Sequence, residues 1–537
     1  MAWLGLPRHS SDLDFKTHSA RWLRDRSPSI ISRSSEPSQY GLSIQEGLNL
    51  DSESIAPGER KLVIILPVDT PSPDLCKVIS SAVALGYPAP VLVNWKRDFN
   101  TGEEGVGPSH LGKVTGTLDF LEWATGSDVD DIDRLSDEDI VVMLDAHDVW
   151  LQLPPQVLMH RYFRSIQQAN RHLEREYGFF NGSWMQQTIM TSAQKGCFAP
   201  RDPLSDLHCN MLPESTLAPD VYGFWTDTTL WGWNYLRPRY VNSGSFMGPA
   251  ADIKRYFSRV RDKMNKRMVV LANGQELGGD QGLFSETFAE QEIWRSRLRN
   301  DYASGYSEAI EKTIQLRDTF EYHVSLDYTQ ELFYPTCYSE TDGYFVALGD
   351  QDAVVRESAR LGVSPPRVPG IPSDVEEVDT PLAALEGVPD DKRGWGAMSL
   401  YTDFWTTAVP VAVHHNAWKN GLKSRRVTWW DKTWFFPYLR QLIAAHSDPT
   451  QETGPIATIP ADNGALDIVP FDNKRMQRTA LLFGKKSRDD GWRLREAEWE
   501  AVCKNEDAAA ETERHWFDEV LRDGKGPLIA AKTSDGQ

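Results

Sequence analysis

Residues 139–150 read DIVVMLDAHDVW, and this stretch decides the predicted fold. The run from Ile140 to Leu144 contains no polar residue, which is typical of a strand buried on both faces of a parallel sheet. Asp145 ends the run, and Asp148 follows three residues later. A buried strand that ends in two carboxylates delivers them to the crevice where open α/β sheets bind their ligands.

Asp145 and Asp148 form a candidate metal pair. Two neighbouring carboxylates repel each other unless a cation or a proton lies between them. Mg²⁺ and Mn²⁺ prefer oxygen ligands and often share them with the phosphates of a substrate. The alternative is an Asp-rich turn in which Asp148 caps the next segment. This stretch alone supports the two interpretations equally.

The composition limits the class of protein. The chain has 537 residues, of which 40% are hydrophobic and 25% charged, and this is ordinary for a globular protein. Its length predicts two domains or one large decorated domain. The net charge of −20 argues against nucleic acid and anionic membrane as partners, because both require a basic face. Most of the 19 tryptophans are expected in a core, although sugar sites also stack aromatic rings on sugar faces.

The cysteines and the search for targeting segments limit the kinds of site and the compartment. The five cysteines form no CxxC pair, so a zinc site is not supported. One disulfide is compatible with the spacing, for example between Cys197 and Cys209, but a disulfide framework is not. No apolar run reaches the ~18 residues that span a bilayer, and the N-terminus lacks the apolar segment of a signal peptide. The sequence therefore favours a cytosolic protein or a form without its targeting segment.

Three parts follow from the order of the patterns. Residues 1–57 are rich in Ser, Arg and Pro and predict a mobile arm. Residues 58–440 predict one α/β domain, with a surface insertion rich in Pro, Asp and Glu near 350–395. Residues 441–537 predict a polar, partly helical extension, with charged helical segments from 488 to 522. The α/β domain opens with a strand at 61–66, a helix at 73–85 and a strand at 91–95, which is a βαβ unit.

Several polar stretches inside this domain are candidate binding segments. No GxGxxG or GxxxxGK[ST] is present, so a dinucleotide site and a P-loop are unsupported. Asn242-Ser243-Gly244 offers small side chains that suit close approach of a ligand, or is a plain loop. Asp280 either caps a helix or binds a substrate hydroxyl. Lys113, at the start of a helical pattern, either reaches a phosphate or is simply solvated.

Four stretches together resemble one known family. They read VMLDAHDVWLQ at 142–152, YVNSGSFMG at 240–248, GGDQGLF at 278–284 and VHHNAWKNGLK at 413–423. Their order and spacing are similar to the glycosyltransferase domain of the procollagen-lysine glycosyltransferases, which uses UDP-sugars and a divalent metal. The resemblance covers about residues 60–435. It implies a GT-A fold: a Rossmann-like, mostly parallel sheet flanked by helices, with a smaller mixed sheet on the acceptor side.

The resemblance also implies roles for individual residues. It makes Asp145, Asp148 and His414 the ligands of Mn²⁺ or Mg²⁺, with His415 as the competing histidine. Asp280 and Gln281 would lie on the catalytic, acceptor side. The remaining matches imply contacts with the UDP-sugar, at Val68, Asp69, Thr70, Lys113, His147, Asn242, Ser243, Gly244, and Lys419 or Lys423.

Three departures from the family pattern stand out. His147 takes the place of an aromatic residue between the two metal aspartates. Gly278 and Gly279 stand where relatives carry acidic residues, which affects acceptor recognition. Ala417 replaces the glycine of His-x-Asn-Gly. Nothing resembles the lysyl hydroxylase domains that accompany this module in animals, so collagen is not implied as a substrate.

These observations predict a metal-dependent enzyme that transfers a sugar from a UDP-sugar to a hydroxyl acceptor. The metal would neutralise the UDP leaving group, and Asp280 would accept the acceptor proton. The first alternative is a sugar-nucleotide pyrophosphorylase or other nucleotidyltransferase, although PVDTPSPDL lacks the basic Gly-rich loop of that class. The second is a GT-A module that binds carbohydrate without catalysis. By analogy, the family implies the secretory lumen as the compartment.

Overall fold

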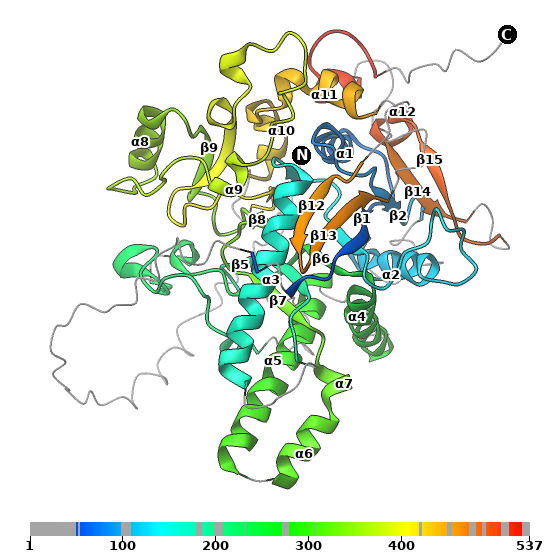
Figure 1. Ribbon diagram of the computed structural model, residues 1–537, viewed down its shortest axis with the longest axis vertical. Helices are drawn as coiled ribbons and strands as arrows, with labels where there is room; N and C mark the ends of the chain where they lie inside the picture. Colours follow the sequence, from blue (N-terminus) through cyan, green and yellow to red (C-terminus); the bar gives the residue numbers. More distant parts are fainter. Residues whose placement is uncertain are drawn as a thin grey trace, which may run out of the picture. The chain divides into compact units, whose positions relative to one another are not determined.

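The computed structural model describes residues 50–51, 54–97, 109–178, 185–197, 208–230, 232–270, 279–305, 307–417, 422–447, 454–471, 479–485, 490–505 and 515–528. Residues 50–537 form one compact unit by their contacts. The predicted N-terminal arm, up to residue 49, lies outside these ranges. The fold is mixed α/β, with a large and mostly parallel central sheet flanked by helices (Figure 1).

The central sheet is built around its first strand, β1. One edge of β1 pairs in parallel with β3. The other edge is shared, because its first half pairs with β13 and its last residues pair with β2. The order along the sheet is β15-β14-β2-β1-β3-β6-β5-β7, with β12 added to β13. The strands are β1 (Gly58–Pro67), β2 (Val91–Val93), β3 (Ile140–Leu144), β5 (Ile189–Gln194), β6 (Tyr240–Pro249), β7 (Val324–Asp327), β12 (Ala457–Ala461), β13 (Gly464–Pro470), β14 (Ala480–Gly484) and β15 (Arg493–Ala497).

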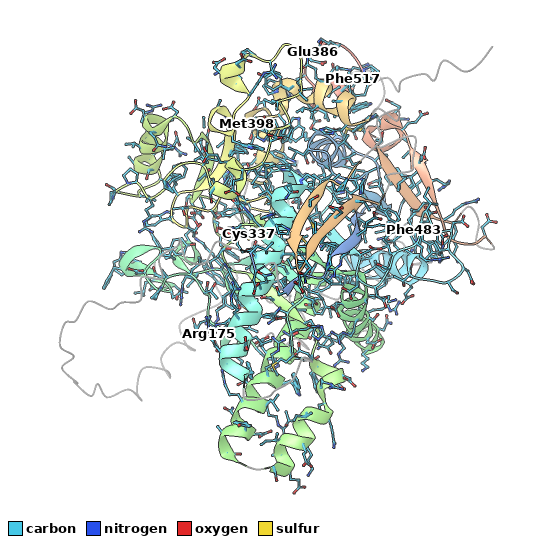
Figure 2. All side chains as sticks on the ribbon, viewed as in Figure 1. Arg175, Cys337, Glu386, Met398, Phe483 and Phe517 are labelled. Carbon is cyan, nitrogen blue, oxygen red and sulfur yellow. A yellow bond between two sulfur atoms is a disulfide. The ribbon has the colours of Figure 1, made fainter. Side chains whose placement is uncertain are left out.

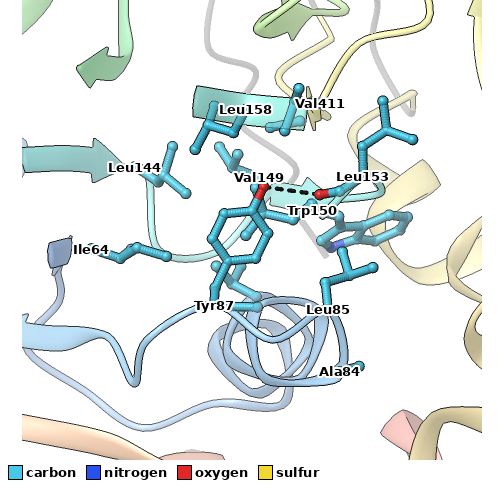
Figure 3. Close-up of a cluster of buried hydrophobic side chains, with 14 of the residues drawn as sticks. Ile64, Ala84, Leu85, Tyr87, Leu144, Val149, Trp150, Leu153, Leu158 and Val411 are labelled. Atoms are coloured by element: carbon cyan, nitrogen blue, oxygen red, sulfur yellow. Dashed lines mark hydrogen bonds between the residues drawn. The ribbon is translucent and has the colours of Figure 1, made fainter. Parts of the chain in front are cut away.

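Both faces of this sheet are buried, as the apolar run in β3 predicts. Because side chains alternate along a strand, Val142 and Leu144 enter one core while Val141 and Met143 enter the other. Figure 3 shows the first core, where the Tyr87 hydroxyl donates a 2.9 Å hydrogen bond to the carbonyl oxygen of Leu153. This bond satisfies the phenol inside an apolar surrounding.

The long helices cover the two faces. Helices α1 and α3 contribute to the first core, and α2, α4 and α5 to the second. Ser72 caps α1 by accepting a hydrogen bond from the backbone N–H of Leu75. The helices are α1 (Pro73–Ala84), α2 (Gly112–Ala124), α3 (Pro155–Tyr177), α4 (Ala250–Val270), α5 (Asp280–Ser304), α6 (Ser307–Gln315), α7 (Arg317–Phe320), α8 (Gln351–Arg360), α9 (Ser373–Glu376), α10 (Arg425–Thr428), α11 (Leu439–His446), α12 (Trp499–Cys503) and α13 (Trp516–Val520).

Two smaller sheets complete the fold. The first is a mixed three-stranded sheet in which β11 (Ala412–His414) runs antiparallel to β4 (Val149–Leu151) and parallel to β8 (Phe333–Pro335). The second is an antiparallel pair of β9 (Gly343–Ala347) and β10 (Ser399–Asp403). Since β3 and β4 are separated by only four residues, the chain passes from the central sheet to the mixed sheet between Leu144 and Val149.

The C-terminal hundred residues differ from their prediction. Charged helical segments were expected from 488 to 522, but residues 493–497 form the strand β15, so the helical prediction is wrong there. Four strands of this segment join the central sheet instead of extending from it. They were missed because β14 and β15 are only five residues long and β15, with three exposed charged residues, does not alternate strictly between buried and exposed positions.

Residues 350–395 also bury more than a surface insertion suggests. Helix α9 docks on α3, because Asp374 accepts two hydrogen bonds from the buried guanidinium of Arg161. Val375 and Trp395 are buried in the first core. The positive charges of Arg161 and Arg164 overcome the effect of burial and lower the pKa of Asp374 to about 2. At least one acidic residue of this segment, Asp374, therefore attaches it to α3 instead of facing solvent.

Two disulfides tie the described chain together. The predicted Cys197–Cys209 bond is present, and a second bond joins Cys76 in α1 to Cys503 in α12. Cys337, labelled in Figure 2, is a buried free thiol, and burial raises its pKa to about 12. Within the ranges given above, no helix is both long and apolar enough to cross a membrane.

We predict that loss of the Cys76–Cys503 bond destabilises the protein more than loss of Cys197–Cys209. The first closes a loop of 427 residues and the second a loop of 12, so the first restricts the unfolded chain more strongly. Cys76→Ser should lower the free energy of unfolding by about 2–5 kcal/mol in denaturant titrations. Cys503→Ser should match it, and a Cys76→Ser variant as stable as Cys197→Ser would contradict the expectation.

Candidate metal centre

The two carboxylates lie in the turn that joins the two sheets. The backbone N–H of Asp145 donates to the carbonyl oxygen of Gly244 at 2.9 Å, which continues the β3–β6 ladder to the first carboxylate. Asp148 immediately precedes β4. Their side chains are 29% and 15% exposed, so solvent and solutes can reach both. The predicted strand thus delivers both aspartates to the C-terminal edge of the sheet.

His414 completes the group from the far end of the domain. It ends β11, where it pairs with Val149, the residue after Asp148. Its Nε2 lies 3.2 Å from Oδ1 of Asp148 and 3.5 Å from Oδ2 of Asp145. One possible ligand atom from each of the three residues lies within 4.8 Å of the others. The structure therefore brings together the three residues that the sequence singled out as metal ligands.

The structure decides between the two histidines. His415 turns away from the aspartates, and its ring lies 4.0 Å from the ring of Trp150, centroid to centroid. Burial lowers the pKa of His415 to about 3, so its ring is neutral. Its backbone N–H, and not its ring, contacts Asp148, donating to the carbonyl oxygen at 2.7 Å. His414 is the histidine that faces the carboxylates.

A second layer of hydrogen bonds orients His414. Oδ1 of Asn242 accepts from the backbone N–H of Gly244 at 3.0 Å and lies 3.2 Å from Nδ1 of His414. Nδ2 of Asn242 donates to Gln194 at 2.8 Å, which fixes the amide orientation. Because the amide oxygen is an acceptor, Nδ1 of His414 must carry the proton toward it. The lone pair of Nε2 is then available to a metal ion.

Lys113 lies beside the carboxylates of Asp145 and Asp280 and neutralises part of their charge. Its Nζ lies 2.6 Å from Asp145 and 2.8 Å from Asp280, and it donates to the carbonyl oxygen of Ser243 at 2.9 Å. Burial opposes its charge, but the two aspartates raise the pKa of Lys113 well above its usual value. The ammonium is therefore surrounded inside the protein by two carboxylates and one carbonyl oxygen.

The charge balance of this group fits a divalent cation. Asp145, Asp148 and Asp280 carry three negative charges, and Lys113 supplies one positive charge, so two negative charges are left when His414 is neutral. Without a cation, His414 itself is driven to take up a proton: burial would lower its pKa, but Asp148 and Asp145 raise it. Burial likewise opposes the charge of Asp148, yet His414 lowers the pKa of that carboxyl far below its usual range. The donor set of two carboxylates and one imidazole suits Mn²⁺ or Mg²⁺.

Asp280 takes a position that differs from the capping alternative. Gly279, with a φ of 125°, is the N-cap of α5, and the side chain of Asp280 turns to Lys113 instead. Although burial opposes its charge, Lys113 lowers the pKa of Asp280. Gln281 lies half-buried beside it in the first turn of α5. Gly278, the other glycine of the departure from the family pattern, lies outside the described residues.

The end of β1 lies beside the same turn. Val68 is buried and donates its backbone N–H to Val93 at 3.0 Å, while Asp69 is half-buried and Thr70 exposed. Ser72, in the loop that follows β1, connects this segment to the turn that carries the aspartates. Its hydroxyl hydrogen-bonds to Nδ1 of His147 at 3.3 Å. His147, between the two aspartates, thus turns toward the loop that follows β1.

The candidate phosphate contacts are only partly brought to the site. Lys419 lies outside the described residues, and Lys423 is exposed in a helical turn. Arg426 is a stronger candidate that the sequence analysis missed, because it is close enough to Asp148 to lower the pKa of that carboxyl further. Asp74 in α1 holds its Nε at 3.0 Å. The only local signal was the basic run KSRR at 423–426.

Two other supporting residues also escaped the sequence analysis. Ser72 could have been found from Ser-Pro-Asp, a typical helix start, but not its contact with His147. Gln194 had no local signal, because its role depends on pairing with Asn242 from another strand.

No protein-family model matches this chain, and no curated protein matches it. The class that the fold and the site define is therefore a mixed α/β protein with a candidate divalent-metal centre at the edge of its central sheet.

We predict that Gly244→Ala weakens metal binding about 10–100-fold. A Cβ at this position would lie 2.2 Å from Cε1 and 2.4 Å from Nδ1 of His414, so the imidazole must move. Calorimetric titration with Mn²⁺ measures the effect. Gly394→Ala is the matched control, because nothing lies within 4 Å of its added Cβ. Equal affinity in the two variants would show that His414 is not a ligand.

Proposed function

We propose that this protein is a metal-dependent glycosyltransferase of the GT-A type, which transfers a sugar from a UDP-sugar to a hydroxyl acceptor. The observation that carries the proposal is the convergence of Asp145, Asp148 and His414 at the C-terminal edge of a mostly parallel sheet. Open α/β sheets bind nucleotides at this edge. The order of the four sequence stretches supports the same class.

The three ligands would hold Mn²⁺ or Mg²⁺, and the bound ion would supply a Lewis acid for the charge that develops on the departing diphosphate. Asn242 keeps the Nε2 lone pair of His414 turned toward the ion. Lys113 keeps Asp145 in place through their 2.6 Å ion pair. Lys113 therefore acts as a positioning residue in this proposal, since its donors are already taken by protein groups.

The nucleotide would lie along the loop from Val68 to Thr70 and beside His147. The ring of His147 is held by Ser72, and its flat face suits contact with a base. Arg426 would contact the diphosphate, because it lies near Asp148 and its guanidinium is 37% exposed. Lys419 and Lys423 stay as further candidates for that contact.

Asp280 would face the acceptor hydroxyl. Its lowered pKa makes it a weak base but a permanently ionised hydrogen-bond acceptor near neutral pH. Such a carboxylate can orient a hydroxyl and accept its proton as the new glycosidic bond forms. The neighbouring Ser243 helps to hold the carboxylate in its charged form.

The two disulfides support an oxidising compartment for this reaction, because disulfides persist in secreted and lumenal proteins and are rare in the cytosol.

The proposal is tested by the metal-dependent release of UDP. With Mn²⁺ and a panel of UDP-sugars, the wild-type protein should release UDP, and Asp145→Asn and Asp148→Asn should lower that rate at least about 100-fold. Asp137→Asn is the control, since this exposed carboxylate precedes the same strand. Failure of the wild-type protein to bind any UDP-sugar would overturn the proposal, and pyrophosphate-dependent formation of UTP would assign nucleotidyltransfer instead.

A second expectation separates Asp280 from the metal ligands. Asp280→Asn should lower transfer to an acceptor about 100-fold, because the neutral amide cannot accept the proton. Binding of Mn²⁺ should weaken less than in Asp148→Asn, because Asp280 contributes charge but is not a ligand, and binding of the UDP-sugar should change little. Calorimetry measures both. If Asp280→Asn weakens Mn²⁺ binding as strongly as Asp148→Asn, the carboxylate serves the metal centre and not the acceptor.

A further inference from the structure

The segment between β5 and β6 carries an unusual set of exposed apolar side chains. Nine large hydrophobic residues are exposed within the described ranges, and five of them lie between residues 211 and 233. Phe224 is 91% exposed, Leu230 81% and Trp233 41%. Large exposed apolar patches mark interaction sites in soluble proteins. We call this group the aromatic platform; its members are Met211, Phe224, Trp225, Leu230 and Trp233.

A backbone hydrogen bond and the side chain of Arg237 hold the part of the platform that carries Leu230 and Trp233. The backbone N–H of Asp227 donates to Tyr235 at 2.9 Å and closes the turn that carries Leu230 and Trp233. Arg237 donates to the carboxylate of Asp227 and also to the carbonyl oxygens of Ser215 and Leu217. These bonds hold the backbone near Leu230 and Trp233, so less of the backbone has to be ordered when a partner binds.

Trp233 is backed by a second ring. Its ring stacks on that of Tyr338 with centroids 5.0 Å apart and planes at 18°. The pair lies directly on Gly196, where a Cβ would approach Tyr338 at 2.4 Å and Trp233 at 2.5 Å. Tyr338 is only 5% exposed, so it supports Trp233 from behind while Trp233 faces solvent.

The platform is connected to the metal centre by a short series of contacts. Gln194 donates to the carbonyl oxygen of Gly196 at 2.7 Å, on which the stacked rings rest, and accepts from Asn242 at 2.8 Å. Asn242 in turn orients His414. From the other side, Thr336, two residues before Tyr338, donates its backbone N–H to the carbonyl oxygen of His414 at 2.9 Å.

We propose that the aromatic platform binds a pyranose ring of a carbohydrate acceptor, so that the acceptor of the proposed transfer is a glycan. This inference rests on the proposed function. A pyranose presents faces of C–H groups that pack on aromatic rings, and its hydroxyls stay solvated. Beside the platform, Arg237 and Arg239 are paired with Glu214 and Asp227, so the surrounding surface offers no excess positive charge to an anionic ligand such as a nucleic acid. The contacts through Gly196, Gln194 and Asn242 connect the platform to His414 of the metal centre.

Saturation-transfer NMR tests the platform independently of turnover, with a panel of methyl pyranosides and disaccharides as probes. The wild-type protein should bind at least one of them, and Phe224→Ala and Trp233→Ala should weaken that binding about tenfold. Phe224 contacts the ring of Trp225 and is almost fully exposed, so its removal leaves the fold intact. Trp233→Tyr should retain binding. Tyr302→Ala, an exposed aromatic residue on α5, is the control and should bind as the wild type does.

The outcomes separate this inference from the proposed function. Binding of UDP-sugar with Mn²⁺ should be equal in Phe224→Ala, Trp233→Ala and wild type. The platform proposal is overturned if no probe binds, if the two variants bind as well as wild type, or if light scattering shows that Phe224→Ala converts a dimer into a monomer. Loss of UDP-sugar binding in the wild type, with sugar binding intact, would overturn the proposed function alone.

Discussion

The site depends on how the buried strand β3 places negative charge at its end. Asp145, Asp148 and Asp280 converge there, and a single ammonium, that of Lys113, bridges two of them. Burying charges is costly unless they are paired, and one lysine cannot pair three carboxylates. Lys113 alone therefore leaves excess negative charge at this site. A proton on His414 would balance part of that charge, and a divalent cation would balance more of it. An ion at this position would join the turn between β3 and β4 to β11.

The surrounding chain is arranged to keep that charge in place. β6 does so with small residues: Gly244 leaves room for the imidazole, and Ser243 turns a carbonyl oxygen to Lys113. The mixed sheet brings His414 opposite the turn that carries the aspartates. Candidate segments that are far apart in the sequence thus lie around one cluster, at the end of β3, in β6 and β11, and in the first turns of α2 and α5.

The sequence predicted the parts of this arrangement that have local causes. The uninterrupted apolar run placed β3, and the polar residues after it marked the site, because strand burial and strand ends are visible in residue type. The choice between His414 and His415 could not be made, since alternate residues of a strand point to opposite faces and both neighbours of β11 were unknown. Lys113 was expected either to reach a phosphate or to be solvated, but it is buried and its partners come from the end of β3, from β6 and from α5. Pairing between such distant segments leaves no mark in local spacing. The same reason explains the missed strands β13 and β14, which find their partners β1 and β2 some 400 residues earlier. The strands β12 and β15 then pair with β13 and β14.

The pairing of β1 with β13, and of β2 with β14, also has a consequence for biosynthesis. A ribosome releases the first strand long before residues 464–484 exist, so one edge of the nascent sheet has no partner until translation is almost complete. An apolar strand with an open edge is prone to pair with other chains. The central sheet can therefore be completed only late in translation, and its open edge is exposed to other chains until then.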